Sequence, residues 1–172
     1  MKFLIIIAIV FTFSLSLCAQ QQAQMLKNGD AAPVFSGQKM DGTPYDLSQL
    51  QGKVVVLTFW STRCAICHSE IPKLNQVVDR YRDKDVVFVA ATMDSEPKIQ
   101  AYLKKTPFNF TIMPNAFGMM LQYADKDRSG NINMGFPAHF VINRQGAIAM
   151  RADGWDKTDD LDSKIRALLS ME

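Results

Sequence analysis

Hydrophobic residues occur along this chain in two patterns, continuous runs and helical repeats, and the two alternate. Residues 54–60 form an apolar run, rich in β-branched and aromatic side chains and broken only by Thr58. Such a run is typical of a strand buried on both faces. The next segment predicts an amphipathic helix, because its apolar residues recur at helical spacing: Ile71, Leu74, Val77, Val78 and Tyr81.

Further runs and repeats continue this alternation to the end of the chain. We expect strands at residues 86–91, 110–113, 139–142 and 147–151, and helices at residues 96–105, 116–123 and 161–169. Ser95 is expected to cap the helix at 96–105, and residues 125–133 are expected to form a polar loop. Turn residues predict a hairpin turn at 143–146 and irregular structure with a short hairpin over 27–52. Strands joined by helices, followed by a terminal hairpin and helix, predict an α/β sandwich.

Composition and charge narrow the class of protein. The 172 residues are 48% hydrophobic and 21% charged, which fits one globular domain and excludes an intrinsically disordered chain. The 19 basic residues nearly balance the 17 acidic ones, so there is no general electrostatic reason to bind nucleic acid. The sequence has no internal repeat, which excludes solenoids and propellers. We therefore expect a single-domain monomer without a nucleic-acid partner.

Residues 1–19 are typical of a secretory signal peptide. Lys2 precedes an uncharged apolar run over residues 3–17, which is shorter than the roughly 20 residues that span a bilayer. Cleavage after Ala19 would leave a polar segment, 20–27, ahead of a domain that occupies residues 28–172.

Two other interpretations of this N-terminus are open. Lipidation of Cys18 would tether the protein to a membrane, although Leu17 is larger than the small residue that usually precedes a lipidated cysteine. An uncleaved apolar segment would also act as a membrane anchor. All three interpretations predict a periplasmic or other extracytoplasmic location, where disulfides persist.

The candidate chemistry lies at Cys64 and Cys67, between the strand at 54–60 and the helix that follows. We expect Cys64 at the helix N-terminus, where unpaired N–H groups and the positive end of the helix dipole favour a thiolate. A thiolate is the form that attacks a disulfide. Cys67 follows about one helical turn later, within disulfide reach of Cys64. We expect Cys67 to be the more buried of the two and to act as the resolving thiol.

The residues around this motif resemble the thioredoxin superfamily. Residues 59–67 (FWSTRCAIC) resemble its active-site segment. Three further segments resemble its TlpA/ResA-like branch, which comprises exported thiol-disulfide oxidoreductases: 29–35, 70–74 and 135–142. The resemblance covers most of residues 28–169. It implies a thioredoxin-like three-layer α/β/α sandwich with a mixed central sheet and an N-terminal extension.

The resemblance also implies a function. Cys64 and Cys67 would reduce disulfide-bearing exported proteins, apocytochrome c among them, and a membrane-borne thiol-disulfide electron donor would restore the dithiol. Two departures leave the redox direction open: Arg63 replaces an aromatic residue frequent in the family, and Ala65-Ile66 replaces a pair that commonly contains proline. Residues near the cysteines tune the reduction potential. The opposite role, oxidising exported proteins, would use the same atoms.

Further residues are candidates for roles beside the cysteines. Glu70 lies where the resembling family has an acid that influences thiol titration, and we expect it to accept the proton of Cys67. A surface glutamate paired with Lys73 is the structural alternative. Pro137 resembles the family's cis-proline, which would let the Phe136 backbone pair with an extended substrate segment. A proline that starts a strand is the alternative there.

Trp60, Arg63 and His68 complete the candidate site. Trp60 would shield the disulfide and contribute to substrate binding. Arg63 and, when protonated, His68 would stabilise the Cys64 thiolate by Coulomb attraction. Trp60 as a core aromatic and His68 as an exposed helix residue are the structural alternatives.

Two other functions use the same cysteines. Cys64-x-x-Cys67-His68 is also the attachment pattern of haem c, which would make the protein an electron carrier. Proteins of that type are mostly helical, whereas this motif follows a strongly β segment. A thiol peroxidase is a lesser alternative, because Leu57 stands where peroxiredoxins have a proline.

We expect no metal ion and no cofactor. The two cysteines with His68 and His139 fit no common zinc spacing. Residues 125–130 imitate the start of a calcium-binding loop, but the twelfth position is Phe136 rather than glutamate, which excludes that site.

Overall fold

The computed structural model describes residues 24–171, so the predicted signal peptide and Cys18 lie outside the described residues. The elements in chain order are β1 (Ser36–Gln38), β2 (Pro44–Asp46), the 3₁₀ helix η1 (Leu47–Leu50), β3 (Val54–Phe59), α2 (Ala65–Arg80), β4 (Val86–Ala91), α3 (Glu96–Leu103), β5 (Thr111–Met113), α4 (Phe117–Tyr123), β6 (Asp125–Lys126), β7 (Ile132–Asn133), β8 (Ala138–Ile142), β9 (Ile148–Asp153) and α5 (Thr158–Leu169). None of the helices within 24–171 has both the length and the apolar character needed to cross a bilayer.

The central sheet is mixed, as predicted. Its strand order is β5-β4-β3-β8-β9. β3, β4 and β5 run parallel to one another, whereas β8 is antiparallel to both β3 and β9. β3 is the middle strand and every one of its residues is buried, which explains its continuous apolar run. The predicted hairpin turn between the last two strands is confirmed, and Gly146 supplies the left-handed backbone (φ 81°) that this turn needs.

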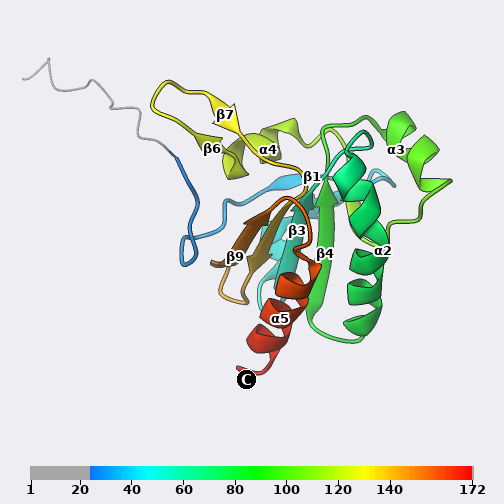
Figure 1. Cartoon of the computed structure of the whole chain (residues 1–172). Helices are drawn as coiled ribbons and strands as arrows, with labels where there is room; N and C mark the ends of the chain where they lie inside the picture. The colour runs from blue at the N-terminus through cyan, green and yellow to red at the C-terminus, as the bar shows by residue number, and fades with distance from the viewer. Residues whose placement is uncertain (1–23, 172) are drawn as a thin grey trace, which may run out of the picture.

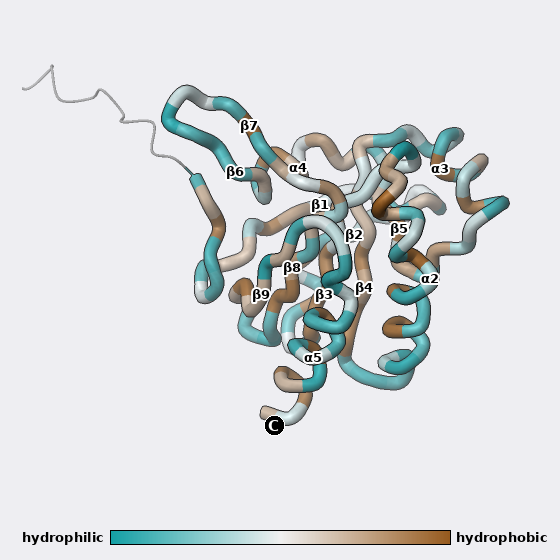
Figure 2. The backbone as a smooth tube through the Cα atoms, viewed as in Figure 1, coloured by the Kyte–Doolittle hydropathy of each residue, from teal (hydrophilic) through white to brown (hydrophobic). Residues whose placement is uncertain are grey.

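Helices cover both faces of this sheet and produce the predicted three layers (Figure 1). On one face α2 contacts α5, and Ile71 and Ile165 of these helices pack with Ile99 of α3 into one core. On the other face α4 and the N-terminal segment form a second core that includes Tyr123 and Phe35. Figure 2 shows the hydrophobic residues gathered on the central strands and the hydrophilic ones on the outer turns and loops. Burial of apolar side chains in both cores is the main force that holds the layers together.

The segment 125–133 differs from its prediction as a polar loop, because β6 and β7 pair as a short hairpin. The Asp127 carboxylate accepts hydrogen bonds from the backbone and side-chain N–H groups of Asn131. Arg151 of β9 makes two parallel hydrogen bonds to the Asp125 carboxylate, at 2.6 and 2.9 Å. Polar side chains rather than apolar alternation hold this hairpin, so a hydrophobic pattern does not indicate it.

Several element ends also differ from prediction. The strand predicted to reach Trp60 ends at Phe59. Ser95 is the N-cap of α3, but its side chain makes no capping hydrogen bond. The last helix begins at Thr158, earlier than the predicted residue 161.

The topology brings three distant segments to one edge of the sheet. Because β3 and β4 are parallel, their carboxyl ends lie at the same edge, and so do the residues that follow Phe59 and Ala91. β8 is antiparallel to β3 and pairs Ala138 with Phe59, so Pro137 arrives at this edge as well. The cysteine motif therefore meets residues that precede β8 and follow β4.

Candidate functional site

Cys64 is the N-cap residue of α2. Its Sγ accepts a hydrogen bond from the backbone N–H of Cys67 at 3.1 Å. The first N–H groups of a helix have no partners within the helix, and the helix dipole places positive charge there. An N–H bond to sulfur stabilises a thiolate more than a thiol, so this geometry favours the nucleophilic form of Cys64. The predicted helix start near Cys64 is confirmed.

Cys67 forms a disulfide with Cys64, with Cα atoms 5.2 Å apart. Cys67 is 2% exposed, whereas Cys64 is only half-buried, as predicted. A partner's disulfide can therefore reach Cys64, while the sulfur of Cys67 can attack only from inside the protein.

Pro137 lies beside the buried cysteine. The Phe136–Pro137 peptide bond is cis, as the resemblance implied. Pro137 is buried and lines a small pocket with Thr58, Trp60 and Cys67, and this pocket has no room for a water molecule. The resolving sulfur is therefore surrounded by protein on this side.

Trp60 lies in the core and not on the surface. It is 1% exposed, and its ring packs against those of Tyr102 and Phe108 at centroid distances of 5.5 and 5.3 Å. Its position shields Cys67 from within but offers no surface to a docking chain. Arg63 is exposed, so solvent screens the effect of its charge on the cysteines.

His68 is half-buried rather than exposed. Its ring stacks on Tyr102 with a centroid distance of 4.6 Å, and its Nε2 atom is buried. An imidazole packed in this way is not presented to an iron atom, which argues against the haem c alternative. Among residues 24–171, no three His, Cys, Asp or Glu side chains are grouped so as to hold a metal ion.

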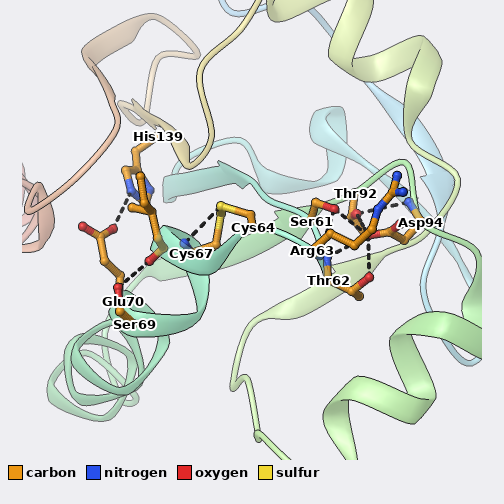
Figure 3. The surroundings of a disulfide bond; sticks show 11 residues. Ser61, Thr62, Arg63, Cys64, Cys67, Ser69, Glu70, Thr92, Asp94 and His139 are labelled. Carbon is orange, nitrogen blue, oxygen red and sulfur yellow. Dashed lines mark hydrogen bonds and ion pairs between the residues drawn. A yellow bond between two sulfur atoms is a disulfide. The ribbon is translucent and has the colours of Figure 1, made fainter.

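Asp94 holds the loop that precedes Cys64 (Figure 3). Its Oδ2 atom accepts hydrogen bonds from the backbone N–H of Thr62 at 2.8 Å and from the hydroxyls of Ser61, Thr62 and Thr92 at 3.0, 3.0 and 3.2 Å. Burial alone would raise the pKa of Asp94, but these hydrogen bonds outweigh burial and lower it below the usual 3.8. The ionised carboxylate therefore fixes the loop that positions the nucleophile.

Glu70 is buried, with 4% of its surface exposed. It is therefore not a surface glutamate paired with Lys73, which was the alternative interpretation of the sequence. Its Oε1 accepts the backbone N–H of Asp156, and its Oε2 lies 3.6 Å from Nε2 of His139. His139 is fully buried, and its Nδ1 is hydrogen-bonded to the Thr58 hydroxyl at 2.9 Å. Figure 3 shows the carboxylate and the imidazole facing each other beside the disulfide. Lys73 pairs with Asp156 at 3.2 Å.

Sequence reasoning did not indicate Asp94, and it considered His139 only as a rejected zinc ligand. A signal existed for each. Asp94 follows a buried strand at the edge where the cysteines lie, and His139 is the only polar residue in the apolar strand 138–142. Buried polar side chains need hydrogen-bond partners, so each of them predicts a polar group nearby.

Comparison with known proteins agrees with this site. The Redoxin family model matches residues 27–169. The thiol-disulfide oxidoreductase ResA of a Bacillus cereus strain is 24% identical over 163 residues, which cover 94% of this chain and 88% of ResA. The soluble secreted antigen MPT53 of Mycobacterium bovis is 33% identical over 115 residues, covering 66% of this chain and 62% of that protein.

Solved structures agree as well. A thiol:disulfide interchange protein of the thioredoxin family from Chlorobium tepidum superposes with a TM-score of 0.69 at 26% identity, covering 83% of this chain and 98% of that one. A secreted disulfide oxidoreductase of Mycobacterium tuberculosis gives a TM-score of 0.62 at 27% identity, covering 78% and 96%. The chain belongs to the Redoxin family, and it is a thiol-disulfide oxidoreductase of the TlpA/ResA-like kind within the thioredoxin superfamily.

Proposed function

We propose that this protein is exported and reduces disulfides in extracytoplasmic proteins, apocytochrome c among them. The observation that carries the proposal is the position of Cys64, whose sulfur accepts an N–H from the first turn of α2 while Cys67 is buried behind it. Export is supported by the signal-like residues 1–19 and by the secreted relatives. The reducing direction is supported by the resemblance to the TlpA/ResA-like branch.

The reaction takes two steps. The Cys64 thiolate attacks one sulfur of the partner's disulfide, forms a mixed disulfide and releases the partner's other sulfur as a thiolate, which takes up a proton. Cys67 then loses its proton and attacks Cys64 Sγ. The Cys64–Cys67 bond forms, the mixed disulfide breaks, and the second partner sulfur leaves as a thiolate and is protonated. Two electrons pass to the partner, so a membrane-borne thiol-disulfide donor has to return two electrons to the protein.

The reduction potential of the Cys64–Cys67 couple tests the direction. The oxidised and reduced forms can be counted by alkylation and mass spectrometry in buffers of defined thiol-disulfide ratio. A potential near that of thioredoxin, about −270 mV, would support a reductant. A potential near that of DsbA, about −120 mV, would overturn the reducing role and leave disulfide exchange intact.

A trapping experiment tests the roles of the two sulfurs. Cys67→Ser is expected to stop after the first step and to accumulate a mixed disulfide through Cys64 with an oxidised Cys-x-x-Cys-His peptide of apocytochrome c. Cys64→Ser is the matched control and should form no such adduct. Full reductase activity in Cys64→Ser would show that the nucleophile is assigned wrongly.

Location is tested separately from chemistry. The full chain and a variant lacking residues 1–19 can be expressed in a bacterium and fractionated. The full chain is expected outside the cytoplasm and the shortened chain inside it. A full-length protein that stays entirely in the cytoplasm would refute export.

A further inference from the structure

His139 and Glu70 face each other with unsatisfied polar atoms. Their side chains are 0% and 5% exposed, and Nε2 and Oε2 are 3.6 Å apart, which is longer than a hydrogen bond. Neither atom has a hydrogen-bond partner among the described residues. Unpaired buried polar atoms destabilise a fold, and an apolar residue at position 139 would fit the otherwise apolar strand β8. The presence of an imidazole at this position therefore points to a role in the chemistry of the site.

The other ends of both side chains are fixed. Glu70 Oε1 accepts the N–H of Asp156, and the Thr58 hydroxyl bonds Nδ1 of His139 at 2.9 Å. A hydroxyl can donate to a neutral imidazole nitrogen or accept from a protonated one, so Thr58 suits both protonation states of His139. Thr58 also lines the water-free pocket beside Cys67. The residue that bonds His139 therefore lies close to the resolving sulfur.

The geometry points to His139 as a positioning residue that allows the buried Glu70 carboxylate to take, and share, the proton of the Cys67 thiol. This inference rests on the proposed function and assigns the proton of its second step. The pocket beside Cys67 has no room for water, which favours a protein group as the acceptor of this proton. Glu70 is one helical turn from Cys67 on the same helix, and residues at that spacing are neighbours.

Atoms and charges balance in this step. The S–H bond of Cys67 breaks and its proton passes to the Glu70–His139 pair, where it is shared between Oε2 and Nε2. The Cys67 thiolate attacks Cys64 Sγ, the intramolecular disulfide forms, and the partner's sulfur leaves with the electron pair of the broken bond. The departing thiolate is protonated from solvent, and the pair later releases its proton to solvent.

The charged groups around the pair suit this exchange. On α2, the cysteines and Lys73 lie on the same side of the helix as Glu70. Lys73 is paired with Asp156 of the loop before α5, and both of these side chains are 59% exposed. β3 contributes the neutral Thr58, and β9 pairs the neutral Ala152 with His139. The cysteine sulfurs are therefore the groups nearest to the pair whose charge changes during the reaction. A nearby change of charge has a strong effect on a buried pair.

Reaction with 5,5′-dithiobis(2-nitrobenzoate) isolates this step without a protein substrate. Cys64 of the reduced protein releases one coloured thiolate, and attack by Cys67 releases the second. We expect His139→Asn and Glu70→Gln each to slow the second release at pH 7 at least about tenfold, within the range of general acid–base catalysis. The double variant should be no slower than either single variant, because both residues serve one proton.

Two further variants separate proton sharing from packing. His139→Gln keeps a donor near Oε2 but cannot take a proton, so it should remain slow, and a wild-type rate in this variant would overturn the inference. Asp162→Asn removes a buried carboxylate of α5 away from the site and is expected to release both thiolates at wild-type rates. A wild-type second release in His139→Asn would also overturn the inference.

A measurement on the unaltered protein covers the case in which the variants fold poorly. The ring nitrogen chemical shifts of His139, measured by NMR at pH 7, should differ between the disulfide and dithiol forms, because the charge of the nearby sulfurs differs. Identical shifts in the two forms would refute the coupling. Neither experiment depends on the reduction potential or on an exported partner, so each can fail while the proposed function stands, and the reverse also holds.

Discussion

Replacement of Asp94 by asparagine tests the anchoring of the loop before Cys64. Four hydrogen bonds reach Oδ2 of Asp94, and the residue is 7% exposed. A hydrogen bond to a charged group contributes about 1.5–3 kcal/mol. Four donors on one oxygen are not additive, and water can reach the half-buried Ser61 and Thr62. Asparagine keeps one acceptor oxygen and loses the charge, so we expect the free energy of unfolding to fall by about 2 kcal/mol at pH 7.

The pH dependence of this loss has a definite sign. The pKa of Asp94 is lower in the folded protein than in the unfolded chain, so ionised Asp94 stabilises the fold fully above about pH 4. That contribution disappears as the pH falls through the lowered pKa of the folded state. The stability difference between wild type and Asp94→Asn should therefore shrink steadily below about pH 4.

Urea unfolding of the disulfide form, followed by circular dichroism at several pH values, measures both effects. Asp41→Asn is the matched control, because Asp41 accepts two hydrogen bonds from Thr43 but is exposed. It should unfold at the wild-type midpoint. If Asp94→Asn also unfolds at the wild-type midpoint with an unchanged slope, or if its loss of stability persists undiminished at low pH, the reasoning is wrong.

Three more substitutions test other contacts. Asp162→Asn keeps one oxygen for the Tyr81 hydroxyl but loses the charge that pairs with Arg80 and Arg166. It should cost about 2 kcal/mol in urea unfolding at pH 7, and wild-type stability would contradict this. Tyr123→Phe deletes a hydroxyl that donates to the Pro33 carbonyl at 2.7 Å, and a calorimetric loss of about 1 kcal/mol is expected, so an unchanged melting temperature would count against it. Arg151→Gln breaks the bidentate pair to Asp125 of β6, and because both partners are partly exposed the loss of stability should be about 1 kcal/mol. Faster amide exchange confined to β6 and β7 would support this prediction, and unchanged exchange would contradict it.

The elements with strong local patterns could be predicted from the sequence. β3 is buried on both faces and α2 on one, and each leaves its own periodicity in the order of apolar residues. The β6–β7 hairpin could not be predicted in this way, because Arg151, which holds it, comes from a strand 26 residues further along the chain.

The candidate site also has a part that the sequence predicts and a part that it does not. Cys64 and Cys67 are three residues apart, so helical geometry alone brings their sulfurs together and puts the first at the helix N-terminus. The Thr58–His139 contact joins residues 81 positions apart, and the Asp94 hydrogen bonds join the segment after β4 to the segment after β3. Residue spacing carries no information about such pairs, because only the pairing of strands brings them to one edge of the sheet.

The sequence by itself determined the alternating strands and helices, the reactive pair of cysteines and their family resemblance, because each is written in residues that are neighbours along the chain. Only the tertiary structure decided that Glu70 is buried against His139, that Trp60 supports the site from the core, and that Asp94 anchors the nucleophile's loop. Burial and charge at these positions depend on which strands pair and which layers pack over them, and both result from the whole chain folding together.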